Sequence, residues 1–177
     1  MKKVIFRIVL GFLCFGFQKV QAQEEIDKLR ISLGPDISLP LGTLKTTNSL
    51  GLVGTLQLAY PVSEKIRVVT SLGGGSFQAK SYDDGYYTSN YPTIGLLQYK
   101  LGAQFFVVDK LFFTAKLGIS YVTQKGSSTF GFTYSPFIGY EFSKGGDVYI
   151  RYESIAAKTV ADNKINSIGI GFNYHLF

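Results

Sequence analysis

The chain offers few side chains that could carry out catalytic chemistry. Its only histidine is His175, near the end of the sequence. A histidine works as a general base only when a nucleophile or a substrate proton lies within reach. We place His175 at the rim of the predicted fold where the chain ends, away from a position that a substrate would reach. The sequence therefore predicts no catalytic residue and no enzyme.

Two further motifs contain residue types that can bind a cation, act as acid and base, or bind a phosphate. Asp83 and Asp84 are paired acids, which can bind a cation or act as acid and base. They lack a histidine, a second acidic cluster or calcium-loop spacing, and Asp-Asp-Gly is typical of a turn. Gly73-Gly74-Gly75-Ser76 lacks the lysine and the helix of a phosphate loop. We expect neither a metal nor a cofactor at these positions.

The segment around the paired acids is rich in tyrosine. Tyrosine-rich loops form contact surfaces at a low cost in entropy. Such a loop could bind a glycan, a protein or lipopolysaccharide, and an unliganded surface loop remains the alternative. The candidate contact residues are Tyr82, Asp83, Asp84, Tyr86, Tyr87 and Tyr91.

These motifs are carried by segments in which apolar and polar residues alternate. Between 168 and 176 the even positions are apolar or aromatic, whereas 167, 169, 171, 173 and 175 are Ser, Gly, Gly, Asn and His. A period of two is the pattern of a β-strand with two different faces. The same pattern recurs at 29–39, 52–60, 66–77, 92–107, 111–121, 130–142 and 148–152.

The links between these eight segments alternate in length. Those near 63–64, 109–110 and 144–146 are tight, and those at 42–49, 78–91, 124–128 and 157–164 are longer and more polar. An even-stranded, up-and-down barrel has such alternating links, with both chain ends on the side of the short turns. The sequence therefore predicts an all-β, eight-stranded antiparallel barrel.

Residue size and charge decide which face is inside. The polar face combines glycine, serine and threonine with long charged side chains, which suits a narrow closed lumen where charges pair and glycines leave room. On a solvent-exposed face, glycines would weaken a strand without any gain in packing. The charges assigned to the lumen are Arg30, Asp36, Arg67, Lys100, Lys116, Glu141, Arg151 and Glu153.

Aromatic residues cluster at the two ends of the predicted strands. Tyrosine and phenylalanine side chains favour the level of lipid headgroups. Two belts of them, one at each end of the strands, therefore indicate a transmembrane barrel. A soluble, lipocalin-like barrel with ordinary strand aromatics is the alternative. The short-turn group is Tyr60, Phe105, Phe113, Phe142, Tyr152 and Tyr174, and the long-loop group is Tyr91, Tyr121, Phe130 and Phe132.

Residues 1–22 read as a secretory signal peptide. Lys2 and Lys3 precede an apolar run, and Val20-Gln21-Ala22 offers a cleavage site. Its removal takes away four cations and leaves 14 Lys and Arg against 12 Asp and Glu, so the net charge falls from +6 to +2. This balance gives little support for nucleic-acid binding. We expect residues 23–28 to form a short lead-in and residues 29–177 to form the barrel domain, which contains no cysteine.

The signal, the eight hairpin strands rich in Gly, Tyr and Phe, and the last strand ending in Phe177 resemble the small outer-membrane β-barrel proteins. That group includes the OmpA membrane domain, OmpX and the PorT-like barrels. The resemblance implies location in the outer membrane, contact with its lipid, and recognition of the terminal phenylalanine by the barrel-assembly machinery. It implies a structural or surface-binding role. A narrow transport channel or a PorT-like secretion component is the first alternative, and a soluble periplasmic binding protein is the second.

Overall fold

The computed structural model describes residues 29–83, 88–142, 145–158 and 164–176. The expected signal peptide at 1–22 and lead-in at 23–28 lie outside the described residues, as do Asp84, Tyr86 and Tyr87 of the tyrosine-rich loop.

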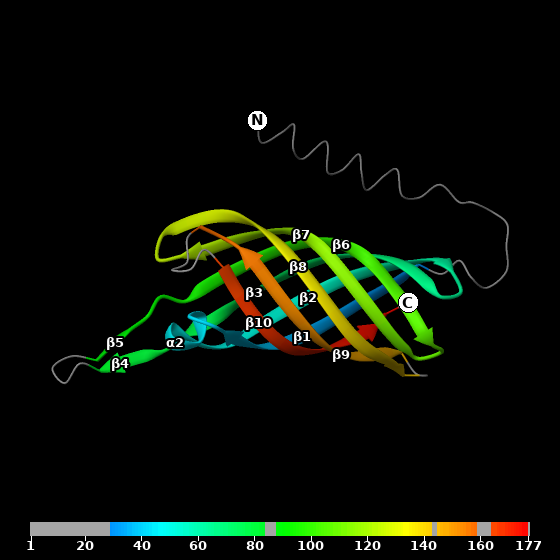
Figure 1. The fold of residues 1–177 in the computed structure, drawn as a ribbon, viewed down its shortest axis with the longest axis horizontal. Helices are drawn as coiled ribbons and strands as arrows, with labels where there is room; N and C mark the ends of the chain where they lie inside the picture. The colour runs from blue at the N-terminus through cyan, green and yellow to red at the C-terminus, as the bar shows by residue number, and fades with distance from the viewer. Residues whose placement is uncertain (1–28, 84–87, 143–144, 159–163, 177) are drawn as a thin grey trace, which may run out of the picture.

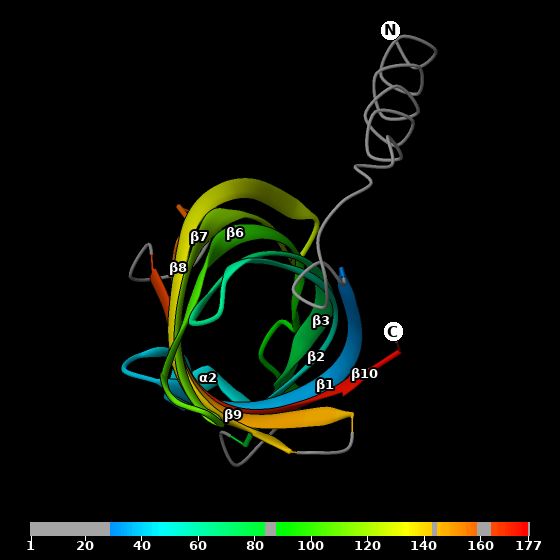
Figure 2. The same ribbon diagram turned by 90° about the vertical axis from the view of Figure 1, so that its right-hand side faces the viewer.

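Eight long strands close into one antiparallel barrel in the order β1-β10-β9-β8-β7-β6-β3-β2, which runs continuously back to β1 (Figures 1 and 2). Consecutive barrel strands pair with each other, and β1 pairs with β10 to complete the ring. The predicted up-and-down topology is confirmed. The strands are β1 (Arg30–Leu41), β2 (Asn48–Ser63), β3 (Ile66–Ala79), β6 (Ile94–Val108), β7 (Leu111–Gln124), β8 (Ser127–Phe142), β9 (Gly146–Ala156) and β10 (Lys164–His175).

The alternation in the sequence becomes an apolar outer wall and a mostly polar interior. Leu117 on β7 exposes 56% of its surface, whereas Thr133 on the neighbouring β8 is completely buried. A soluble barrel has the opposite arrangement, so the lipocalin-like alternative is wrong. The outer wall exposes leucine, isoleucine and aromatic side chains. Pairing of β1 with β10 closes the barrel, so the barrel sheet has no edge strand, as a hydrocarbon environment requires. The fold is that of a transmembrane β-barrel.

One predicted link is shorter than its sequence suggests. The polar residues 124–128 read as a long loop, but β7 and β8 continue to pair through Gln124 and Ser127. Only Lys125 and Gly126 form the turn, both with positive φ, +46° and +80°. Such angles are typical of the two-residue turns that match the twist of a hairpin. The strand count is unaffected, because the chain still reverses here.

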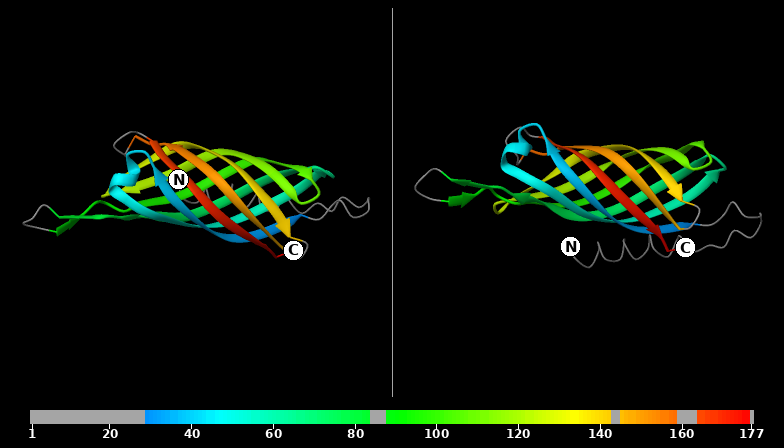
Figure 3. Two further views of the ribbon diagram at one scale, coloured as in Figure 1. Left: turned by 60° about the horizontal axis from the view of Figure 1, so that its bottom comes forward. Right: turned by 90° about the horizontal axis from the view of Figure 1, so that it is seen from below.

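The long segment between β3 and β6 forms a separate hairpin. Its strands β4 (Ser81–Asp83) and β5 (Thr88–Asn90) pair only with each other. The hairpin projects past the barrel rim at the end opposite the short turns (Figures 1 and 3). A short helix, α2 (Leu44–Thr47), lies at the same end, between β1 and β2. Over the described ranges, no helix combines the length and the apolar character needed to cross a membrane.

The outer wall carries aromatic side chains near both ends, with two corrections to the predicted groups. Tyr152 lies in the middle of β9 and packs against Tyr134, with ring centroids 6.0 Å apart, instead of near the short turns. Tyr91 lies in the link before β6 and packs against Tyr82 of the hairpin, so it is not on the wall. The other predicted residues lie on the barrel strands.

Candidate functional site

The interior of the barrel is filled in layers, which can be followed along one strand. The inward residues of β9 run Asp147, Tyr149, Arg151, Glu153 and Ile155 from the short-turn end to the loop end. They lie, in this order, in a polar rim, an aromatic layer, a charged layer and an apolar layer.

Arg151 is the centre of the charged layer. Its Nη1 donates to Glu153 Oε2 at 2.7 Å, and its Nη2 donates to Asp36 Oδ1 at 2.8 Å. The same Nη2 reaches Ser38 Oγ at 3.1 Å, and Ser38 donates to Asp36 Oδ1 at 2.6 Å. One guanidinium thus joins carboxylates from β9 and β1, which lie on either side of β10. The planar guanidinium is suited to such a fixed, multidentate position.

Lys100 and Gln98 extend this layer from β6. Lys100 Nζ forms an ion pair with Glu153 Oε2 and donates to Gln98 Oε1 at 3.0 Å. Gln98 in turn donates to Glu153 Oε1 at 2.9 Å and to Ser120 Oγ at 3.2 Å. Both oxygens of Glu153 are therefore occupied. Glu153 on β9 and Lys100 on β6 come from strands that β8 and β7 separate in the ring, so their contact spans part of the lumen.

Lys116 is the exception among the predicted lumen charges, because its hydrogen-bond partners are neutral side chains. Its Nζ donates to Gln57 Oε1 at 2.5 Å and to Ser71 Oγ at 3.3 Å. The ammonium also lies 5.0 Å from the centre of the Phe137 ring, a cation–π distance. Hydrogen bonds and an aromatic face, instead of a carboxylate, accommodate this buried cation.

The remaining predicted charges gather at the short-turn rim, apart from the central layer. Glu141 forms ion pairs with Arg30 at 2.7 Å and with Arg67 at 2.6 Å. The Arg67 guanidinium also lies over the Phe106 ring, 4.4 Å from its centroid. All eight side chains assigned to the lumen thus point inward, but they do not form one network: seven of them make two separate groups of ion pairs, and Lys116 stands apart from both.

The aromatic layer between these groups was not predicted. Phe112, Phe137 and Tyr149 form a buried cluster, with Phe106 packed against it. Phe112 meets Phe137 edge to face at 6.3 Å, and Phe137 lies 4.9 Å from Tyr149. The period-two alternation places all three on the inward face of their strands, so their positions in that pattern could have predicted the cluster.

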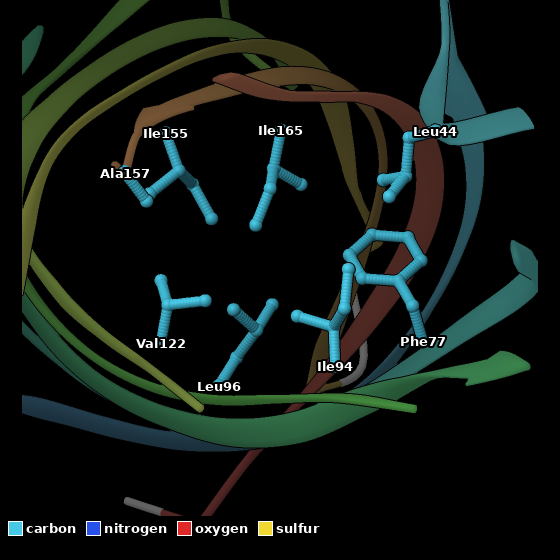
Figure 4. Close-up of a cluster of buried hydrophobic side chains, with 8 residues drawn as sticks. All are labelled: Leu44, Phe77, Ile94, Leu96, Val122, Ile155, Ala157 and Ile165. Carbon is cyan, nitrogen blue, oxygen red and sulfur yellow. The ribbon is translucent and has the colours of Figure 1, made fainter. Parts of the chain in front are cut away.

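A second apolar cluster fills the loop end of the lumen (Figure 4). The labelled side chains converge from opposite walls, and several of them are completely buried. Sequence reasoning missed this cluster because it expected polar residues throughout the interior. Its members are Leu44, Phe77, Ile94, Leu96, Val122, Ile155, Ala157 and Ile165.

The structure adds Asp147 to the polar rim and gives His175 a structural partner. His175 Nε2 lies 2.9 Å from Asp147 Oδ2, and Asn173 Nδ2 donates to Asp147 Oδ1 at 2.9 Å. Asp147 was missed because it follows the Gly145-Gly146 turn, yet it is in phase with Arg151. Among the described residues no group of three or more His, Cys, Asp and Glu side chains could hold a metal ion.

The hairpin is attached firmly to the barrel rim. The Lys80 amide donates to Thr47 O at 2.9 Å, and the Tyr91 amide donates to Lys80 O at 3.0 Å. Buried Asn48 donates from Nδ2 to Phe77 O and Pro92 O, at 3.4 and 3.3 Å, so it ties β3, which leads into the hairpin, to the link that follows the hairpin. The rings of Tyr82 and Tyr91 pack together at a 44° tilt, with centroids 4.8 Å apart. Of the predicted loop residues, the structure describes Tyr82, Asp83 and Tyr91.

Comparison with solved structures identifies this architecture. Ail, the attachment invasion locus protein of Yersinia pestis, crystallised with the heparin analogue sucrose octasulfate, matches with a TM-score of 0.58 and 12% identity, over 86% of this chain and 100% of that one. Neisserial surface protein A matches with a TM-score of 0.52 and 12% identity, over 82% and 96% of the two chains. This chain has the fold of the small outer-membrane β-barrels.

Designed proteins are also similar to this chain in fold. De novo designed transmembrane β-barrels match with a TM-score of 0.51 and 14% identity, over 83% of this chain and 95% of the design. No protein-family model and no curated protein matches the sequence. At identities this low, what is shared with these small outer-membrane barrels is the fold.

Proposed function

We propose that this protein is a surface protein of the outer membrane, in which a non-conducting barrel anchors the β4–β5 hairpin for contact with a partner outside the cell. The observation that carries the proposal is a lumen blocked by an aromatic, a charged and an apolar layer of side chains. Beside it, a hairpin projects past the barrel (Figure 3). The location rests on the barrel fold and on the expected signal at residues 1–22. Catalysis is not part of the proposal.

The filled lumen disfavours the transport alternative. An eight-stranded barrel has an interior just wide enough for side chains. Here the charged layer is bridged across part of the lumen by Lys100 and Glu153, and an apolar and an aromatic layer lie on either side of it. An ion would have to displace both layers and break the pairs between them. A PorT-like role in secretion would need a protein partner, which the hairpin could equally contact.

The hairpin has the properties of a contact surface prepared in advance. The Lys80 amide holds the base of the hairpin to Thr47 O of α2, and the Tyr91 amide joins the two sides of the base by bonding to Lys80 O. The described part of the hairpin therefore has little freedom to lose on binding. Exposed Tyr82 packs against Tyr91 with the rings tilted by 44°, and this contact offers a rigid aromatic surface. Ser81 and Asn90, which are exposed and joined by a 2.7 Å hydrogen bond, add polar groups beside it.

A glycan is the partner that this surface fits best. Aromatic faces with neighbouring hydroxyl and amide groups suit the mixed apolar and polar character of sugars. The loop-end segments 42–49, 78–91, 124–128 and 157–164 contain five lysines against three aspartates, which favours an anionic sugar. The Ail structure, with its bound heparin analogue, supplies a suitable probe.

The test compares the full-length protein in lipid vesicles with a Tyr82→Ala, Tyr91→Ala variant. Binding of fluorescently labelled heparin and of a neutral dextran would be measured, and heat-modified gel mobility would confirm that both proteins are folded. We expect heparin binding by the wild type, little dextran binding, and a clear loss of heparin binding in the variant. Equal binding by the two folded proteins would contradict the role of the hairpin.

A further inference from the structure

A polar hollow lies at the loop end of the barrel, between the start of β6 and the β7–β8 turn. It has a volume of about 270 Å³ and is lined by Thr93, Tyr121, Thr123, Gln124, Lys125 and Ser128, among others. Thr123 is in phase with lipid-facing Leu117 and pairs with Gly95, which has no side chain to cover it. The hollow therefore opens on the wall that faces the membrane.

The only charged residue that lines the hollow is a lysine. The other lining side chains supply hydroxyl, phenol and amide groups, all of which can donate hydrogen bonds. No carboxylate is present to neutralise the lysine within the hollow. Such a lining suits an anion with several acceptor oxygens, as in a phosphate group.

The backbone places this lysine in a conformation that lysine rarely adopts. Lys125 has φ +46°, in the left-handed region that asparagine and glycine favour at the first position of this turn. A residue held there at an energetic cost is a reason to look for a function. The turn keeps the Lys125 side chain beside the hollow, at the barrel rim.

The depth of the hollow corresponds to lipid headgroups. Next to the hollow, toward the middle of the strands, the Tyr121 and Phe130 rings pack on the outer wall with centroids 5.1 Å apart. Aromatic rings on a membrane barrel favour the headgroup boundary. Below this pair, the same three strands and β3 form a second hollow, of about 580 Å³, lined by Val68, Leu101, Leu117, Ile119 and Phe132 among others. Its lining side chains are apolar.

The two hollows are aligned along β7. Ile119 lines the lower hollow and Thr123 the upper one, four residues apart and so separated by about 13 Å of strand. One leaflet of hydrocarbon is about 15 Å deep, half of a bilayer core. A single lipid molecule can therefore extend from one hollow to the other.

From this alignment we propose that the outer wall of β6, β7 and β8 holds one phosphate-bearing membrane lipid in a fixed position. Its phosphate oxygens accept hydrogen bonds from Lys125, Thr93 and Thr123, and an acyl chain lies in the apolar hollow between Leu101 and Phe132. This lipid site is separate from the hairpin surface, and it does not depend on the glycan partner.

The test is native mass spectrometry of the full-length protein refolded in detergent, with phosphatidylglycerol or the phosphate-free lipid diacylglycerol added. We expect one retained phosphatidylglycerol per barrel and weak retention of diacylglycerol. Lys125→Gln should weaken phosphatidylglycerol binding about tenfold, as expected for the loss of a charged hydrogen bond. Lys158→Gln, which changes an exposed lysine at the same end of the barrel, is the control and should leave retention unchanged.

Three results would overturn the site. Equal retention of phosphatidylglycerol by Lys125→Gln and the wild type would show that Lys125 does not bind the lipid. Equal retention of phosphatidylglycerol and diacylglycerol would show that the site does not recognise the phosphate. Displacement of the lipid by millimolar inorganic phosphate would indicate a free-anion site and not a lipid site. Ile119→Ala gives a second, independent variant, which should weaken retention through the acyl chain alone while leaving heat-modified gel mobility intact.

Discussion

Gly169 lies directly across the β9–β10 ladder from Arg151. A Cβ atom at position 169 would lie 2.6 Å from Ser38 Oγ and 3.0 Å from Asp36 Oδ1, the two acceptors that hold the arginine. The same relationship recurs in the β6–β7 ladder, where Gly118 faces Lys100. Glycine opposite a long charged side chain is thus the device that fits the charged layer into a narrow barrel.

Gly169→Ala should therefore destabilise the barrel by about 1–3 kcal/mol, the range for overpacking a filled interior. Gly74→Ala is the matched control, because Gly74 lies on the exposed wall with no atom closer than 3.8 Å to the added carbon. Urea unfolding in lipid vesicles measures both. Equal stabilities of the two variants would show that the interior near Gly169 is not closely packed.

Arg151→Ala should cost about 3–5 kcal/mol, because it leaves the carboxylates of Asp36 and Glu153 buried with one partner fewer. Lys158→Ala, at an exposed position, should change the free energy of unfolding by less than about 0.5 kcal/mol. Adding Asp36→Asn to Arg151→Ala should recover part of the loss, since one unpaired charge disappears. A loss no larger than that of the surface variant would mean that the charged layer contributes little.

Leu117→Arg tests the outer wall. Leu117 is exposed in the middle of β7, so the cation would meet hydrocarbon and should cost about 2–4 kcal/mol. Val108→Arg places the same side chain at the end of β6, where the cost should fall to about 0–1 kcal/mol. Refolding into vesicles over a urea series gives both values. The same cost at both depths would contradict the assigned position of the membrane.

Cysteine labelling tests which end of the barrel faces outward. The expected mature chain contains no cysteine, so a single introduced thiol can be followed. Ser89→Cys on the hairpin should react with a membrane-impermeant maleimide on intact cells. Glu64→Cys, exposed at the β2–β3 turn, should react only after the outer membrane is permeabilised. The reverse pattern would invert the topology.

Much of the fold could be predicted from sequence because the alternation has one physical cause. A strand with one face in lipid and one in a narrow lumen must alternate, as Leu117 and Thr133 do on adjacent strands. The alternation cannot reveal a strand where successive residues are all polar. Gln124 and Ser127 were read as part of a loop, yet they pair with each other across β7 and β8, and the turn is only two residues long.

The contents of the lumen were harder to foresee. The phase of the alternation shows that Ile155 points inward, but not that side chains from α2, β3, β6, β7, β9 and β10 meet in one apolar cluster. That meeting depends on strand stagger around the ring, which no single segment of the sequence encodes. The same holds for Lys116, which contacts Gln57, Ser71 and Phe137 from three other strands.

The central claim is that the barrel is a closed anchor. Reconstitution of the purified protein in a planar lipid bilayer, with current recorded over a range of voltages, tests it most directly. The packed layers around Arg151, Phe137 and Ile155 predict that no stable conductance is seen above the baseline of the protein-free membrane. Steady, well-resolved channel openings by the wild-type protein would contradict the closed lumen and would favour a transport function.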